Sequence, residues 1–248
     1  MKSERSPLLT GLSSVLVALL LTFGASRAQA AAPVAGIVIS MEGKPEYQLA
    51  GSGAYRGLRL NMMVHEGDII KTGPGVRVGV AFVGGAELRI NENSSFRMDS
   101  GGGSKPTSVF TQFGNAWTRL LHGRSGMNVR TPTAVAAVRG TEADVNYGDG
   151  PMTVRVYEGF VDVTNAKGTT SLKAGQQTRV TGAGTAPEPP KAMSPQDYGT
   201  WQNALKAADL NKSLKLLEGV ADKNRTLELE MKDKEGKSKK LKMRFEKK

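Results

Sequence analysis

The chain has 248 residues, no cysteine and a formal net charge of +11 at pH 7. Without cysteine, disulfides, thiol catalysis and cysteine-ligated metal sites are excluded. Much of the basic surplus lies in residues 205–248, which contain 14 Lys and Arg against 8 Asp and Glu. In a cytosolic protein this surplus would favour nucleic-acid binding, whereas in an exported protein it favours anionic lipids and polymers.

The first 30 residues have the three parts of a secretory signal peptide. Lys2 and Arg5 form a basic start, Leu8–Phe23 is mainly apolar, and residues 28–30 (AQA) match the cleavage pattern. The apolar run is shorter than the roughly 20 residues of a spanning helix. We therefore expect cleavage before Ala31, rather than an uncleaved anchor, and no transmembrane segment in the mature protein.

Residues 34–182 carry the period-two pattern of β-strands. Apolar and polar residues alternate over Arg77–Phe82, Thr153–Tyr157 and Phe160–Thr164, as in strands that bury one face. Glycine-containing turn signals separate such runs at residues 66–68, 73–75, 84–85, 101–103, 148–150, 158–159 and 174–175. We predict an all-β domain of many short strands, arranged in a β-helix-like or sandwich stack.

The segment after this domain changes in composition. Residues 183–193 are predicted to be a linker, because their prolines favour extended backbone and remove hydrogen-bond donors. A helix is expected to begin with Ser194 as its cap, followed by Pro195 and then Asp197. The residues expected on one face of this helix are Tyr198, Trp201, Leu205 and Ala208.

Residues 194–248 are predicted to form a small appendage of helices and a basic hairpin. A second short helix is expected over Leu210–Val220. Thr226–Glu246 alternates apolar and charged residues around Gly236, which favours a β-hairpin over a helix. Centred on Gly236, the hairpin would pair Glu230 with Lys242 and Glu228 with Arg244.

Several short motifs, in order, resemble the FecR domain, a bacterial envelope module. The first half contains EGDIIKTG at 66–73, the strand-like VRVGVAFVGGAELRI at 76–90 and NSSF at 93–96. The second half contains TP at 131–132, VRGT at 138–141, EGFV at 158–161 and AGQQ at 174–177. The order and spacing of these motifs, over Val34–Thr181, carry the resemblance.

The resemblance implies a periplasmic β module that takes part in protein recognition. Family members that restrain a sigma factor carry a cytoplasmic helical domain and a membrane span. Here Met1–Pro7 precede the apolar run, so we expect no anti-sigma domain and do not transfer the signalling role. Ala143 also departs from the large apolar residue that the family often has at this position.

No residue type is spaced in a way that specifies a reaction. Glu66, Asp68 and Glu92 fit turn positions better than catalytic or metal-binding ones. His65 and His122 lack the spacing of a zinc site. We therefore predict no metal site and no cofactor.

Three further features also favour structural roles. Ser125 lies in GRSG, which is not a nucleophile motif. Residues 139–141 (RGT) fit a turn better than a ligand site. Alternation in FGNAWTRLL predicts that Trp117 is buried in the β core, and Trp201 is expected to dock on the β domain.

The favoured function is a non-enzymatic, free-standing FecR-type binding or scaffold module of the periplasm. Its expected partner is an envelope protein or an anionic polymer or lipid, not nucleic acid, and export past the outer membrane stays open. One alternative is an enzyme or accessory subunit acting on envelope polysaccharide or peptidoglycan, recognisable by paired carboxylates in a groove. Another is a structural subunit that pairs exposed strand edges.

Overall fold

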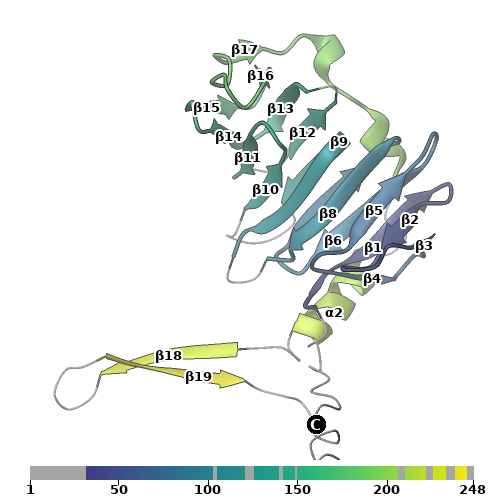
Figure 1. Ribbon diagram of the computed structural model, residues 1–248, viewed down its shortest axis with the longest axis vertical. Helices are drawn as coiled ribbons and strands as arrows, with labels where there is room; N and C mark the ends of the chain where they lie inside the picture. Colours follow the sequence, from purple (N-terminus) through teal and green to yellow (C-terminus); the bar gives the residue numbers. More distant parts are fainter. Residues whose placement is uncertain are drawn as a thin grey trace, which may run out of the picture. The chain divides into compact units, whose positions relative to one another are not determined.

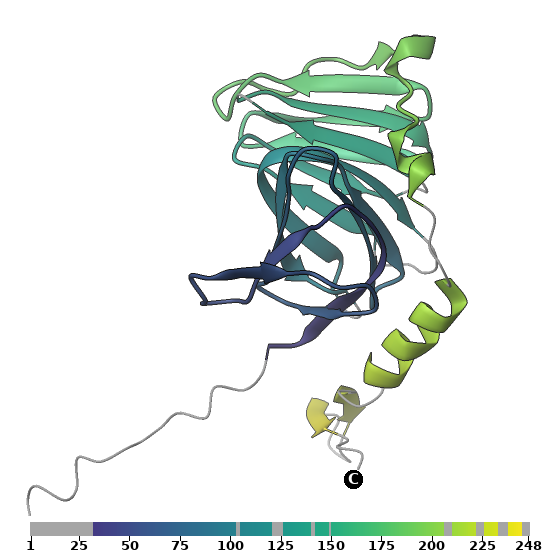
Figure 2. The ribbon, with the colours of Figure 1, turned by 90° about the vertical axis from the view of Figure 1, so that its right-hand side faces the viewer.

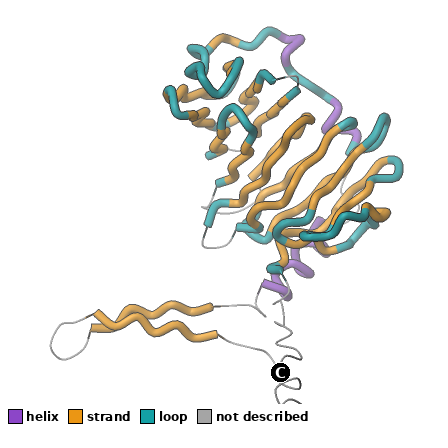
Figure 3. The backbone as a smooth tube through the Cα atoms, viewed as in Figure 1, coloured by secondary structure: helices purple, strands orange, loops and turns teal. Residues whose placement is uncertain are grey.

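The fold was established from a computed structural model that describes residues 32–102, 105–120, 126–139, 142–148, 150–205, 210–221, 226–232 and 238–244. Strands account for 55% and helices for 8% of the structure, so the predicted all-β class is confirmed (Figure 3). The predicted signal peptide, His122, Ser125, Gly140 and Thr141 lie outside the described residues.

Strands β1 to β17 form two hydrogen-bonded sheets that share the long strand β9 (Figure 1). Sheet A has the order β4 (Met63–His65), β1 (Val34–Glu42), β6 (Arg77–Phe82), β7 (Ala86–Ile90), β9 (Thr107–Leu120), β12 (Glu142–Tyr147), β13 (Met152–Glu158), β16 (Gln176–Val180) and β17 (Lys191–Ala192). Sheet B has the order β3 (Tyr55–Gly57), β2 (Glu46–Gln48), β5 (Ile69–Thr72), β8 (Ser94–Ser100), β9, β10 (Met127–Arg130), β11 (Val135–Val138), β14 (Phe160–Asn165) and β15 (Gly168–Lys173). Consecutive hairpins after β9 alternate between the sheets, which gives the irregular stack that the turn spacing predicted (Figure 2).

Strand β9 passes from sheet B to sheet A at Gly114. Its first half pairs with β8 and β10, and its second half pairs with β7 and β12. Gly114 has φ +133°, and a Cβ there would lie 2.5 Å from the Cβ of Ser94. Glycine is therefore required at the crossing, both for its backbone angle and for the close approach of β8.

The main hydrophobic core consists of alternate residues of the two sheets. Val80, Leu88, Phe96 and Val154 are fully buried and belong to one cluster. Ala143 also belongs to it and is fully buried, so its small side chain is accommodated in the core. The polar residues between these positions face away from the core, and those on sheet A form the surface described below.

The turns confirm the glycine pattern of the sequence. Each predicted turn contains a glycine with positive φ, namely Gly67, Gly75, Gly85, Gly102, Gly150, Gly159 and Gly175. Most other residues are disfavoured at such angles. These glycines therefore fix where the hairpins begin and end.

The predicted continuous helix at Ser194 is wrong. The segment instead forms two 3₁₀ turns, η1 (Pro195–Asp197) and η2 (Trp201–Ala204), with extended backbone at Tyr198. The capping box of Ser194 and Asp197 is present as predicted. The helix does not continue because the segment follows the surface of sheet A, where its side chains bond to the strands rather than along a helix.

The second helix is confirmed as α2 (Leu210–Ala221). Its Leu217 is buried against Ile37 and Ile39 of β1 and Ala81 of β6. This small cluster is separate from the main core, because these residues of β1 and β6 lie on the opposite face of sheet A from those in the main core.

The proline-rich segment contacts the β domain. The amide of Glu188 donates to the carbonyl of Arg179 (2.9 Å), and Lys191 pairs with Gln177 in the β16–β17 ladder. Pro187 is buried. These contacts cover the outer edge of β16, a position where an unpaired strand would invite association; the proposed domain boundaries at 182 and 193 stay a prediction.

The tail forms the predicted hairpin, with strands β18 (Thr226–Lys232) and β19 (Ser238–Arg244). The register pairs Glu228 with Lys242 and Glu230 with Lys240. The predicted hairpin is therefore correct, but the predicted register, centred on Gly236, differs from the observed one by two residues. A two-residue shift leaves every residue on its original face, so alternation alone does not distinguish the two registers.

Candidate functional site

A row of polar side chains crosses the outer face of sheet A. Its members are Cα partners in successive strands, from β7 to β17: Arg89, Trp117, Asp144, Arg155, Gln177 and Lys191. We call these six residues the polar row. Each belongs to the alternating set that faces away from the main core, so local strand alternation places them together although they are far apart in the sequence.

One end of the polar row is a buried ion cluster. The carboxylate of Glu87 accepts hydrogen bonds from Arg89 (2.6 Å) and Arg119 (2.7 Å), although the Glu87 side chain is only 1% exposed. The two guanidinium groups lie 4.8 and 5.4 Å from the ring of Trp117. Trp117 is buried as predicted, but its ring packs against two arginines on the outer face and does not belong to the main core.

Asp144 lies at the centre of the row. It is buried, and this burial raises the pKa of its carboxyl above the usual value. Hydrogen bonds from Asn115 (2.9 and 3.0 Å) and the guanidinium of Arg155, 3.5 Å away, act in the opposite direction. The carboxyl is thus held in place by partners on β9 and β13.

Residues 194–205, here called the strap, run over the polar row. Trp201 acts to lower the pKa of the Asp144 carboxyl, and the carbonyl of Gln202 accepts a hydrogen bond from Arg89. Asp197 accepts from Gln177 (2.9 Å) and lies 3.8 Å from the Nε of Arg155. The predicted docking of Trp201 on the β domain is therefore confirmed.

A tyrosine pair fixes the middle of the strap. The rings of Tyr157 and Tyr198 stack with centroids 5.4 Å apart, and the Tyr157 hydroxyl accepts from the amide of Gly199 (3.0 Å). Burial, followed by the nearby charge of Asp144, raises the pKa of Tyr157. The hydroxyl therefore stays neutral, with its proton available for a further hydrogen bond.

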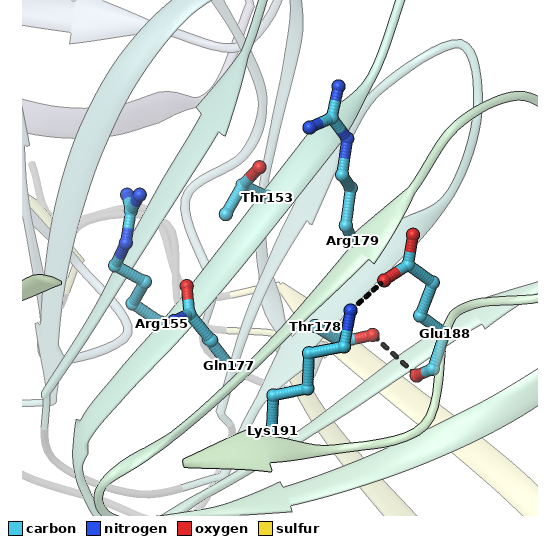
Figure 4. A pocket seen from close by; sticks show the side chains of 7 residues that line it. All are labelled: Thr153, Arg155, Gln177, Thr178, Arg179, Glu188 and Lys191. Atoms are coloured by element: carbon cyan, nitrogen blue, oxygen red, sulfur yellow. Dashed lines mark hydrogen bonds and ion pairs between the residues drawn. The ribbon is translucent and has the colours of Figure 1, made fainter. Parts of the chain in front are cut away.

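The other end of the polar row opens into a cavity of about 270 Å³ (Figure 4). We call it the row-end cavity, and its lining residues are Thr153, Arg155, Gln177, Thr178, Arg179, Glu188 and Lys191. Lys191 forms an ion pair with Glu188 (2.9 Å), and the hydroxyl of Thr178 donates to the Glu188 carbonyl (2.6 Å). Figure 4 shows Thr153 between the side chains of Arg155 and Arg179.

The three carboxylates considered in the sequence analysis, Glu66, Asp68 and Glu92, accept hydrogen bonds from backbone amides, as expected for turn residues. Asp68 accepts from the amides of Ala50 (3.0 Å) and His65 (2.9 Å). Glu66 accepts from the amide of Gly101 (3.1 Å). Glu92 does the same for the amide of Gly75 (2.7 Å).

These carboxylates do not gather into a reactive site. Among the described residues, no group of three or more His, Cys, Asp or Glu side chains is placed to hold a metal ion. Arg139 is exposed and pairs with Asp162 (3.2 Å). Of the seven residues lining the row-end cavity, Glu188 alone carries a carboxylate, so this cavity adds no support to the polysaccharide-enzyme alternative.

The polar row and the row-end cavity were not identified from the sequence. Their residues form no local motif: the contact between Arg89 and Gln202 spans 113 positions. One sequence signal could have pointed to the polar row. Several strands have a charged or amide residue at a position that faces away from the core, such as Arg155 in β13 and Gln177 in β16. In none of the described helices is an apolar stretch long enough to cross a bilayer.

Comparison with known proteins gives a match to a family model and to solved structures. Residues 68–162 match the model of the FecR protein family. Two crystal structures of a candidate anti-sigma factor from Parabacteroides distasonis are similar, each with 22% identity and a TM-score of 0.46. Each match covers 52% of this chain and 61% of the other, and the curated proteins give no match.

The matched range lies inside the region that carries the motifs. It begins at Asp68, in the turn before β5, and ends at Asp162 in β14. It includes the Glu87 cluster, Asp144 and Arg155, whereas Gln177, Lys191 and the strap lie beyond it. The FecR resemblance is therefore confirmed for residues 68–162 of this chain.

Proposed function

We propose that this protein is a non-enzymatic, exported FecR-type module that binds a protein or a surface polymer of the bacterial envelope. The match of residues 68–162 to the FecR family carries the proposal. The signal-like segment before Ala31 supports export to the periplasm. We propose binding and not signalling through a sigma factor, because the family match covers the FecR-like β domain and identifies no sigma-restraining domain.

The chemistry of the polar row supports a binding role. Glu87 is held between two arginines, and Asp144 is bonded to Asn115 and approached by Arg155. Carboxylates whose hydrogen bonds are satisfied in this way hold the outer face of sheet A in one arrangement. The strap covers this part of the row, and the row-end cavity is the open part that presents polar and charged side chains for recognition.

Photo-cross-linking in cells of the source organism tests the binding role. A photoreactive phenylalanine is placed at Tyr55 in sheet B, Phe113 in β9 or Phe160 in β14, all of which are exposed. A module with one partner gives an adduct of constant mass from some positions and none from others. Adducts at no position, or the same mixture at all three, would contradict a specific partner.

The non-enzymatic part has its own assay. Purified mature protein is incubated with isolated peptidoglycan and envelope polysaccharide, and soluble sugar and muropeptide are measured over time. A binding module leaves both polymers intact. Catalytic release of fragments that exceeds the amount of protein would show an enzyme.

A further inference from the structure

The row-end cavity brings together cations from two neighbouring registers of sheet A. In the first register, the Cα partners across β13, β16 and β17 are Arg155, Gln177 and Lys191. In the next register on the same face, Thr153 of β13 is the partner of Arg179 of β16. Arg155 and Arg179 are thus diagonal neighbours, within reach of one another's long side chains. Like charges on neighbouring strands repel one another, and an anion bound between them relieves that repulsion.

The charges in the cavity are only partly compensated. Lys191 forms an ion pair with Glu188 (2.9 Å), and Arg155 forms longer ion pairs with Asp144 (3.5 Å) and Asp197 (3.8 Å). The buried Nε of Arg155 has no hydrogen-bond acceptor among the described residues. Arg179 is exposed, and the described part of the chain places no carboxylate within ion-pair distance of it.

The neutral side chains of the cavity add directed donors. The amide of Gln177 and the hydroxyl of Thr153 belong to the two strands that carry the arginines, and both line the cavity. Guanidinium groups form planar pairs of hydrogen bonds that match carboxylate and phosphate oxygens. The set therefore matches an oxyanion better than a metal ion or an apolar group.

The size of the cavity limits what enters it. Its volume of about 270 Å³ is below the range of roughly 300–1,000 Å³ that is usual for drug-sized ligands. It accommodates a single charged group with a few attached atoms, not a whole polymer segment. The rest of such a ligand would extend from the cavity into solvent.

We propose that the row-end cavity is an oxyanion-binding site, which takes one carboxylate or phosphate group of a larger partner. The proposal depends on the proposed function for its biological setting, because it names the chemistry that the binding module recognises. An acidic polysaccharide supplies this chemistry as a uronate, and a phosphate-bearing envelope polymer supplies it as a phosphodiester or monoester. Arg179 is the main residue expected to contact the anion directly.

Nuclear magnetic resonance on the purified full mature chain tests the site. The Nε–H signal of Arg179 is identified by its loss in Arg179→Gln. Inorganic phosphate and D-glucuronate are titrated separately at constant ionic strength set by chloride, with glucose as the uncharged counterpart of glucuronate. Binding in the cavity shifts the Arg179 signal in a saturable way, and glucose leaves it in place.

Two variants separate this site from general charge effects. Arg179→Gln should weaken binding of the effective anion about tenfold, measured on the Gln177 side-chain amide, because one charged hydrogen-bonding partner is lost. Arg56→Gln removes the same charge from exposed strand β3 of sheet B and should leave binding unchanged. Arg155 is not substituted, because it also lies beside the strap.

The two anions distinguish the sources. Binding of glucuronate alone identifies an acidic polysaccharide, binding of phosphate alone identifies a phosphate-bearing polymer, and binding of both identifies an oxyanion site of broad acceptance. Absence of a saturable shift with either anion, equal shifts with glucose, or equal weakening in both variants would overturn the proposal. Such a failure leaves the cross-linking result intact, so it is distinct from a failure of the proposed binding role.

Discussion

Glu87 illustrates how single polar residues stabilise the outer face of sheet A. Its buried carboxylate joins Arg89 and Arg119, which flank the ring of Trp117. Removing one member of a buried ion cluster leaves the opposite charges without compensation, and this costs more than the intact cluster contributes. The stability of this face therefore depends on the carboxylate more than on either arginine alone.

We predict that Glu87→Gln lowers the free energy of unfolding by about 3 kcal/mol. Glutamine keeps the shape of the side chain but leaves two guanidinium groups without a counter-charge. Urea denaturation followed by circular dichroism measures the loss. The matched control is Glu42→Gln, because Glu42 is half exposed and pairs with Arg77 at 2.8 Å; its loss should stay below about 1 kcal/mol. Equal losses in the two variants would show that the Glu87 cluster is not special.

For single residues, the sequence predicted whether a side chain is buried better than it predicted which side chains surround it. Alternation around Trp117 correctly indicated a buried ring, and it did not indicate that arginines would surround it. The partners of Trp117 come from β7 and β12, and the strap accepts a hydrogen bond from Arg89, one of the two neighbours of Trp117 in the polar row. Such contacts depend on strand register, which single residues do not specify.

Among the elements, the strap is the one that deviates most from its prediction. The cap of Ser194 and Asp197 was correctly predicted from the sequence, and the continuation into a helix was not. Helix propensity was overridden by the hydrogen bonds of Asp197 and Gln202, and by the stacking of Tyr198, on side chains of sheet A. Strands β13 and β14 were predicted closely because each has one buried face and a glycine turn at its end. The bounds of β6 were also predicted from its alternation, although both of its faces are buried.

Docking of the strap should depend on the ionised form of Asp197. The amide of Ser194, then its hydroxyl, stabilises the carboxylate and lowers the pKa of Asp197 below 3.8. Because the pKa of Asp197 is lower in the folded state, its ionised carboxylate stabilises the folded state at pH values above 3.8. This stabilisation is lost as the pH falls through the pKa of the folded state. Asp144 has the opposite effect on the pH dependence of stability. Its pKa is raised in the folded state, so protonation at low pH favours folding.

Hydrogen exchange of the strap measures this dependence. We predict that the protection factor of the Gly199 amide, corrected for the intrinsic exchange rate, stays constant from pH 7 to about 4 and then falls. In Asp197→Asn, protection should be lower at pH 7 and lack this acid-dependent loss. Asp99→Asn is the control, because Asp99 pairs with Arg97 and Arg130 in sheet B. An unchanged profile in Asp197→Asn would remove Asp197 as an anchor.

In the whole molecule, charge is distributed unevenly along the chain. Residues 205–248 contain 14 basic and 8 acidic residues, and the hairpin register places Glu228 and Glu230 opposite lysines. In the described strands Lys239 lies opposite Met231 and Lys232 lies opposite Ser238, and the sequence of the tail has more basic than acidic residues. The surplus favours long-range attraction to anionic surfaces, and added salt weakens such attraction.

Removing residues 226–248 should weaken binding to anionic liposomes while the β domain stays folded. The expected loss is large at low ionic strength and small at high ionic strength, because charge drives it. Co-sedimentation with and without the tail measures binding, and near-ultraviolet circular dichroism checks the fold. If both proteins bind equally, the tail is only a solvated appendage; unfolding of the shortened protein would instead make the hairpin part of the structural core.

The central claim is that the FecR-like β domain, and not the basic tail, recognises the specific partner. The most direct measurement is the yield of the photo-cross-linked adduct from an exposed β-domain position such as Phe160, compared between the full chain and the chain without residues 226–248. Recognition by the β domain predicts an adduct of the same mass, and of similar yield, in both proteins. Loss of the adduct from the shortened, folded protein would contradict the claim and place recognition in the tail.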